Sequence, residues 1–262
     1  MTGPRQAITW VAAVALAALL HPVGPVVAQH HEPVFRAVVL AQRGGHHVEF
    51  VAAARTWLSR LSADSSFSVD YIQTPDSISR EFLGRYRLFI QLDYPPYGWN
   101  DSAQAAFRDF IEEGRGGWLG FHHATLLGEF DGYPMWDWFS GFMGGITFVN
   151  YIASFAAADV NVEVRSHPVF RAVPAQFRIQ KDEWYIYNRS PRAAVRVLAS
   201  VDEGTYDPPS GIRMGDHPVI WTNERVRARN IYIFMGHDPG LFDNPAYTTL
   251  VRNAIFWAAG RF

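Results

Sequence analysis

The chain has 262 residues, 48% of them hydrophobic, no cysteine and a formal net charge of −2 at neutral pH. The absence of cysteine excludes disulfides, thiolate nucleophiles and cysteine metal ligands. The nearly balanced charge, without a basic cluster, argues against a nucleic-acid partner, because binding one requires many cationic side chains to neutralise phosphates.

The first 28 residues have the pattern of a secretory signal peptide. Arg5 precedes an apolar run from Ile8 to Leu20, and the segment ends in the small residue Ala28. Since the apolar run is short for a membrane span, we expect cleavage after Ala28, a secreted protein of the periplasm, and no stable membrane span afterwards. Residues 29–262 have the size of a single α/β domain, and no repeat or linker divides them.

Strand and helix patterns alternate through the first half of this domain. Strands are predicted at 34–41, 67–72, 86–92 and 118–121, with amphipathic helices at 48–61 and 101–113 and a short helix after Thr74. This order is typical of an α/β protein with a mostly parallel sheet and helices on both faces.

The second half alternates strands with turns. Strands are predicted at 160–164, 195–201, 219–222 and 231–235, a surface excursion rich in glycine and proline at 203–216, and a closing helix at 244–260. The aromatic stretch 177–187 contains Asp182 and Glu183, an arrangement that is costly when buried unless the charges are partnered. His167 and His217 each precede a proline and are interpreted as structural turn residues.

Histidines follow three of the predicted strands at the point where each strand ends. They are His46 and His47, then His122 and His123, then His237, which is followed by Asp238. The carboxyl ends of the strands in a wound sheet lie along one edge, where ligands bind. We therefore expect these residues to converge, with Glu183 as the carboxylate of the cluster.

Three interpretations of this cluster stay open. His122, Glu183 and His237 suit a divalent metal such as zinc, manganese or nickel, because neutral imidazoles and a carboxylate are its usual ligands. The same three residues can instead be catalytic as general acid and base on a polar substrate. Each histidine can also be only a structural hydrogen-bonding group. No nucleotide cofactor is expected, and a serine hydrolase is disfavoured because the chain has no Gly-x-Ser-x-Gly motif.

Aromatic residues in the predicted loops suit a carbohydrate substrate. Trp99, Tyr133 and Trp136 are expected to form a wall on which the C–H face of a sugar ring stacks, although a packed core explains such residues equally well. The other residues predicted to bind substrate are His46, His47, His123 and Asp238.

Six segments spread over nearly all of residues 29–262 carry a resemblance to a known family. They are Gly116-Gly-Trp-Leu-Gly-Phe-His-His-Ala124, Ser166-His-Pro-Val-Phe170, Asp182-Glu-Trp-Tyr185, Asp216-His-Pro-Val-Ile-Trp221, Gly236-His-Asp238 and Asn253-Ala-Ile-Phe-Trp-Ala258. Together they resemble the ThuA-like (trehalose utilisation) domain. The resemblance implies a class I glutamine amidotransferase-like, flavodoxin-like fold.

The resemblance also bears on function. In the superfamily the turn after the central strand carries a nucleophilic cysteine, whereas this chain has His122 there, so the fold is expected without glutaminase activity. Family members usually have histidine where Asn150 stands and serine where His123 stands. The family is associated with the breakdown of disaccharides, including 3-keto sugars, which implies a hydrolase, isomerase or lyase. The alternatives are a non-catalytic carbohydrate-binding domain and an accessory partner of another secreted enzyme.

Overall fold

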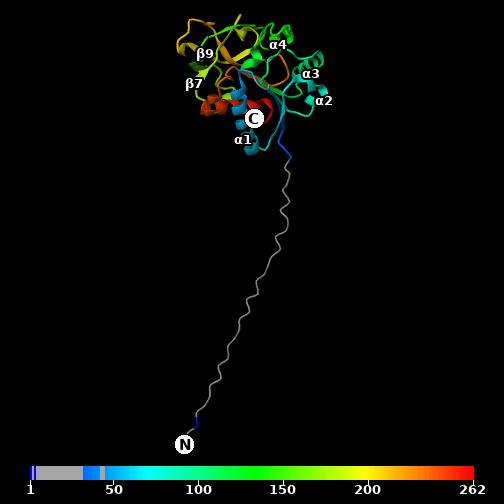
Figure 1. Ribbon diagram of the computed structural model, residues 1–262, viewed down its shortest axis with the longest axis vertical. Coiled ribbons are helices and arrows are strands. Elements are labelled where there is room, and N and C mark those ends of the chain that lie inside the picture. The colour runs from blue at the N-terminus through cyan, green and yellow to red at the C-terminus, as the bar shows by residue number, and fades with distance from the viewer. Residues whose placement is uncertain (2, 4–31, 42–44) are drawn as a thin grey trace. The chain divides into compact units, whose positions relative to one another are not determined.

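The computed structural model of the chain contains a large mixed β-sheet. The structure describes residues 1, 3, 32–41 and 45–262, and residues 33–262 form one compact unit (Figure 1). Apart from residues 1 and 3, the predicted signal peptide lies outside the described residues, as do residues 42–44 of the turn before His46.

The sheet of the described unit has nine strands, in the order β2-β1-β3-β4-β11-β10-β9-β6-β7. Neighbours from β2 to β11 are parallel, and neighbours from β11 to β7 are antiparallel. The parallel strands are β1 (Arg36–Ala41), β2 (Ser68–Ile72), β3 (Leu88–Asp93), β4 (Gly117–Phe121) and β11 (Asn230–Ile233). The others are β6 (Ala156–Val162), β7 (Gln176–Asp182), β9 (Arg196–Asp207) and β10 (Pro218–Thr222), while β5 (Phe148–Tyr151) and β8 (Tyr185–Tyr187) form a separate pair.

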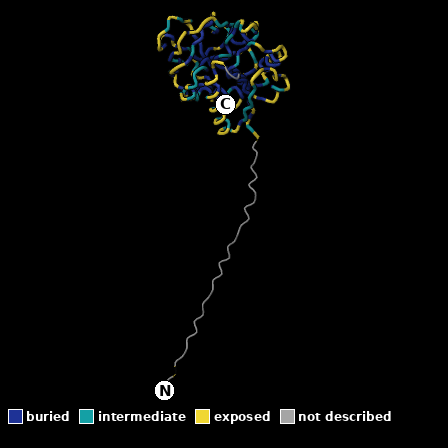
Figure 2. Tube along the Cα trace, viewed as in Figure 1, coloured by how far each residue is buried: buried dark blue, intermediate teal, exposed yellow. Residues whose placement is uncertain are grey.

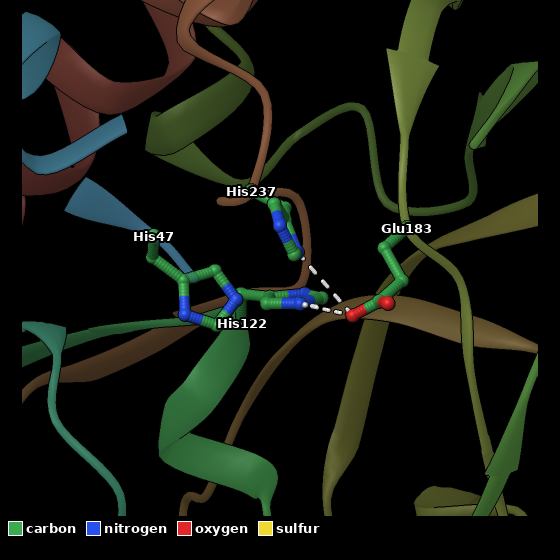
Figure 3. Close-up of side chains that lie close together, drawn as sticks. All are labelled: His47, His122, Glu183 and His237. Atoms are coloured by element: carbon green, nitrogen blue, oxygen red, sulfur yellow. Dashed lines mark hydrogen bonds and ion pairs between the residues drawn. The ribbon is translucent and has the colours of Figure 1, made fainter. Parts of the chain in front are cut away.

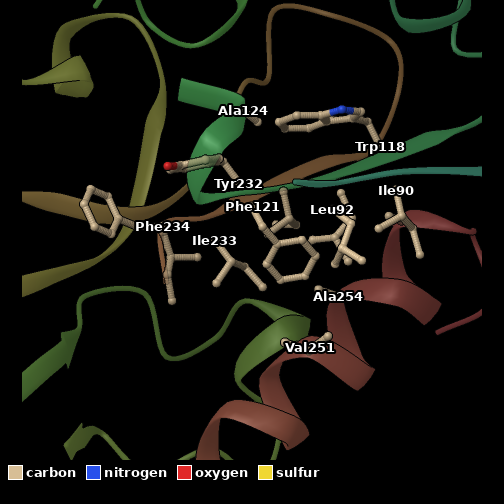
Figure 4. Close-up of a cluster of buried hydrophobic side chains, with 14 of the residues drawn as sticks. Ile90, Leu92, Trp118, Phe121, Ala124, Tyr232, Ile233, Phe234, Val251 and Ala254 are labelled. Carbon is tan, nitrogen blue, oxygen red and sulfur yellow. The ribbon is translucent and has the colours of Figure 1, made fainter. Parts of the chain in front are cut away.

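Helices cover both faces of the parallel strands, and the predicted fold class is therefore confirmed. On one face, α1 (Val48–Ser65) and α5 (Pro245–Ala258) pack against Leu92 and Phe121 (Figure 4). On the other face, α3 (Asp101–Glu112) and α4 (Asp137–Phe142) contribute aromatic rings that pack against Phe89 and Trp118. The remaining helix, α2 (Arg80–Leu83), is short. Figure 2 shows that buried positions gather in the interior of the unit and exposed ones in its outer turns.

The helix ends are set by short polar side chains. Asn100 caps α3 by accepting the backbone N–H of Ala103 at 2.9 Å, and Asn244 caps α5 by accepting that of Ala246 at 3.0 Å. Ser79 caps α2, because its hydroxyl accepts the N–H of Phe82. None of the described helices has the length and apolar character needed to cross a membrane.

The prediction that residues 203–216 form a surface excursion is wrong for the first part of this segment. Strand β9 continues to Asp207, and Glu203 is buried. The Glu203 carboxylate accepts the backbone N–H groups of Met214 and Gly215 at 2.6 and 2.8 Å and lies 3.0 Å from Nδ1 of His217. The glycine and proline residues correctly predicted a turn. They did not predict that the buried carboxylate of Glu203 binds the backbone of this turn from strand β9.

His167 stabilises a buried turn, and its burial leads to a prediction about stability at acidic pH. Its Nδ1 accepts the N–H of Val169 at 3.4 Å, its ring packs on Trp257, and burial lowers its pKa to about 4. Between pH 6.5 and 4 the unfolded chain therefore binds a proton at this site that the folded protein does not, so stability falls as the pH falls through this window.

The expected contribution of His167 to this loss is about 3 kcal/mol at most. Urea unfolding of wild type and His167→Asn at pH 7 and pH 4.5 measures it, and the variant should lose less stability on acidification. An equal loss in both proteins would show that His167 is not the group responsible.

Candidate functional site

Side chains from separate strands meet at the carboxyl edge of the parallel strands. His47 lies after β1, His122 directly follows β4, His237 follows β11, and Glu183 connects β7 to β8 (Figure 3). The chain leaves β1 toward β2 on one side and returns to β3 on the other, and crevices at such reversals are the usual ligand sites of wound sheets. The structure thus brings together the histidines that the strand ends indicated.

His122 is held in an unusual backbone conformation at the centre of the site. Its φ is 24°, and its carbonyl oxygen accepts hydrogen bonds from the hydroxyls of Tyr232 at 3.0 Å and Thr125 at 2.9 Å. A Cβ atom on Gly236 would lie 2.9 Å from Cβ of His122, so only glycine fits there without a shift. The ring is 1% exposed and is therefore positioned by packing on all sides.

The hydrogen bonds of His122 fix which ring nitrogen carries the proton. Nδ1 lies 3.2 Å from the backbone carbonyl oxygen of Phe234, which can only accept, so Nδ1 donates and Nε2 keeps its lone pair. Nε2 lies 3.2 Å from Oε2 of Glu183. Burial lowers the pKa of His122 to about 3, so its ring is neutral at pH 7.

Glu183 supplies negative charge to the cluster. A glutamate carboxyl with its ordinary pKa is ionised at neutral pH. The ionised Oε2 therefore faces the lone pair of His122 Nε2, and it also lies 3.3 Å from Nδ1 of His237. Two acceptors at this distance repel each other unless a cation lies between them.

Asp182 fixes the loop that carries His237. Its buried carboxylate accepts the backbone N–H groups of Gly236, His237 and Asp238 at 3.0, 3.0 and 3.2 Å. Burial raises the pKa of Asp182 to about 7 in spite of these bonds. Two adjacent residues thus position His237. Asp182 accepts the backbone N–H of His237, and Glu183 contacts the His237 ring.

Asp93 adds a second carboxylate that the sequence analysis did not include. It is 2% exposed at the end of β3, and its Oδ1 lies 2.8 Å from Nδ1 of His47 and 3.3 Å from Nδ1 of His123. Burial lowers the pKa of His47. Burial raises the pKa of Asp93, but the contacts with His123 and His47 outweigh it and lower that pKa overall, so the carboxyl is ionised.

A pocket of about 400 Å³ opens onto these groups. Tyr185 lies over the His122 ring with centroids 4.1 Å apart, and Phe155 meets the His237 ring edge-on at 4.7 Å. The pocket therefore combines imidazole and aromatic rings in its lining. Its lining residues are His46, His47, His123, Leu126, Phe148, Tyr151, Phe155, Glu183, Tyr185 and His237.

The structure does not bring the predicted aromatic wall to this pocket. Trp99 and Trp136 are only 4% and 8% exposed and pack against each other and against Phe107. Tyr133 is exposed but stacks on Tyr97, outside the pocket lining. The two tryptophans are therefore part of the core and not of the pocket.

Asp238 also lies outside the pocket lining. Its carboxylate accepts the N–H of Gly240 at 2.9 Å, and it pairs with Nζ of Lys181 at 2.9 Å. Of the residues predicted to bind substrate, the structure places His46, His47 and His123 in the pocket.

The cluster has the composition and spacing of a metal centre. His47, His122, Glu183 and His237 each offer one ligand atom, and these atoms lie within 4.8 Å of one another. Nε2 of His47 is buried and has no hydrogen-bond partner among the described residues. Three imidazoles and a carboxylate are typical ligands of zinc and related divalent ions.

Residues 36–258 match the sequence profile of the ThuA family, which is described as trehalose utilisation. The chain belongs to the ThuA family. A solved structure of a protein described as ThuA-like from Bacteroides uniformis is 29% identical, covers 90% of this chain and 95% of its own, and has a TM-score of 0.77. A solved structure of a ThuA-like protein from Parabacteroides merdae is 20% identical, covers 87% of this chain and 90% of its own, and has a TM-score of 0.64.

More distant structures share the fold of this ThuA-family chain. The glutaminase domain of Trypanosoma brucei CTPS is 11% identical, covers 87% of this chain and 94% of its own, and has a TM-score of 0.52. The expected family and the glutamine amidotransferase-like fold are thus confirmed. No curated protein is significantly similar to the chain.

Proposed function

We propose that this ThuA-family protein is a divalent-cation-dependent enzyme that acts on a carbohydrate or sugar derivative. The observation that carries the proposal is the pair of acceptors at the centre of the cluster: Nε2 of His122 and Oε2 of Glu183 face each other at 3.2 Å. A cation between them converts a repulsive contact into shared coordination, and His47 and His237 lie at the spacing needed to complete its ligands.

The surroundings suit catalysis at such a cation. Bound there, it would supply Lewis-acid chemistry, either by polarising a carbonyl or by lowering the pKa of a water molecule. Tyr185 covers the His122 ring and limits access of bulk water from that side. Asp182 and the carbonyl of Phe234 keep His237 and His122 in position, as the partners of metal-binding histidines usually do. Hydrolysis, isomerisation or elimination all agree with these features.

A carbohydrate substrate is supported by the aromatic residues of the pocket. Phe148, Tyr151 and Phe155 line it together with the histidines, and Tyr151 and Phe155 are exposed. Aromatic faces stack on the C–H face of a sugar ring while polar groups bind its hydroxyls. The description of the family, trehalose utilisation, agrees with this assignment. We also propose secretion to the periplasm, on the signal-peptide pattern of the first 28 residues.

Zinc content tests the cation directly. We expect purified protein, dialysed against zinc and then against zinc-free buffer, to retain zinc, and Glu183→Gln to retain one equivalent less, because the amide removes the negative charge of the cluster. Inductively coupled plasma mass spectrometry gives the stoichiometry. Glu129→Gln is the control, because Glu129 lies outside the pocket lining. The proposal fails if wild type retains no zinc, manganese or nickel.

A further inference from the structure

Asp93 is a buried anion without an aligned donor. Its Oδ1 lies within 3.3 Å of Nδ1 of both His47 and His123, yet neither contact has the geometry of a hydrogen bond. In the described part of the chain, Oδ1 of Asp93 and Nδ1 of His123 are both buried and have no hydrogen-bond partner. A buried charge in this state is costly unless a cation or a set of donors compensates it.

The three groups lie close enough together to share one metal ion, although the 2.8 Å between His47 Nδ1 and Asp93 Oδ1 is shorter than the usual distance between two ligands. One ligand atom from each of His47, Asp93 and His123 lies within 4.8 Å of the others. Ligands bound at roughly 2.0–2.2 Å around a tetrahedral ion lie about 3.3–3.6 Å from one another, close to the 3.3 Å between Asp93 and His123. Two nitrogens and one carboxylate oxygen suit zinc, manganese or nickel.

We propose that Asp93, His123 and Nδ1 of His47 hold a second divalent cation, so that the pocket contains a two-cation centre. The proposal rests on the proposed function, because His47 also belongs to the first group of ligands, to which its buried, unpartnered Nε2 is free to contribute. The His47 ring then bridges the two ions. Binding of the second ion displaces the remaining ring proton, which leaves to solvent, and the ring becomes an imidazolate.

A two-cation centre narrows the class of substrate. Both groups of ligands reach the same pocket. Its lining includes His237 and Glu183 of the first group, His123 of the second, and His47, which belongs to both. Paired ions bind two oxygen atoms of a substrate at once. The sugar derivatives that fit are those with two neighbouring oxygens, such as a hydroxy-ketone or a vicinal diol.

Zinc stoichiometry of single variants tests the second position. With zinc as the probe, we expect two equivalents in wild type and one equivalent each in Asp93→Asn, His123→Gln and Glu183→Gln. The matched control is His46→Gln, which changes a pocket histidine outside both groups and should keep two. Circular dichroism checks the fold. If Asp93→Asn does not fold, the zinc content of His123→Gln tests the second position. The His123 side chain is 16% exposed, so its substitution disturbs the fold less.

The outcomes separate the two proposals. One equivalent in wild type that Asp93→Asn retains overturns the second cation and leaves the first in place. Loss of all zinc in both Asp93→Asn and His123→Gln also overturns it, because these residues would then serve a single ion. No zinc in wild type overturns the proposed function itself.

Discussion

Turnover of a sugar substrate is expected to fall by roughly 10²–10⁴-fold in His122→Ala, while binding of the sugar survives. The ring lies at the centre of the cluster, and its Nε2 faces Glu183. Its contribution is to hold and tune the reacting groups, which matters more in the transition state than in the bound ground state. Product formation from disaccharides and their 3-keto forms measures turnover, and calorimetry with the same compounds measures binding.

The control is His46→Ala, a histidine that lines the pocket but lies outside the cluster. It should change binding modestly and leave turnover close to that of wild type. If His122→Ala turns over substrate as fast as wild type, the catalytic role assigned to the cluster is wrong. Binding of these sugars by wild type without turnover would support the alternative of a non-catalytic carbohydrate-binding domain.

Trp118→Ala is expected to lower the free energy of unfolding by about 3–5 kcal/mol. Trp118 lies in the middle of the sheet on β4, is almost fully buried, and packs against Phe139 and Phe142 of α4. Truncation leaves a cavity between the sheet and α4 that rigid neighbours cannot fill. Urea unfolding of wild type and variant gives the difference.

Gly120 provides an internal control for this prediction. A Cβ atom at this position would lie 2.1 Å from two carbon atoms of the Trp118 ring, so Gly120→Ala should destabilise wild type by about 1–3 kcal/mol. In the Trp118→Ala background the same change should cost little, because the ring is gone. Additive losses in the double-mutant cycle would show that the two residues do not interact.

The parallel half of the fold follows from the sequence more closely than the antiparallel half. Buried strands such as β1 and β4 are continuous apolar runs, and Asn100 and Asn244 mark helix starts. Strand β9 was predicted too short because its second half alternates polar and buried residues around Glu203, whose partners lie in a later turn. Partners of that kind are a property of the fold and leave no local pattern.

The site was predictable wherever a histidine followed a strand. The same rule would have found Asp93, which directly follows the predicted strand 86–92, but it was applied to histidines alone. The role of Asp182 had no signal in the sequence, because its partners are backbone N–H groups of another segment. The aromatic wall was misplaced because residue type does not tell which loop side chains turn into the core. Phe148 and Phe155, rather than Trp99, line the pocket.

The position of β11 has a consequence for how the protein is made. This strand lies between β4 and β10 in the sheet, although it is made only after residues 122–229, which separate it from β4 in the chain. Until then the edge of β4, whose residues are all buried in the final fold, has no partner on that side. A nascent chain thus carries an open apolar edge from the completion of β4 until β11 is made and relies on long-range pairing to close it. The same event delivers His237, so the protein acquires its complete site only when its sheet is closed.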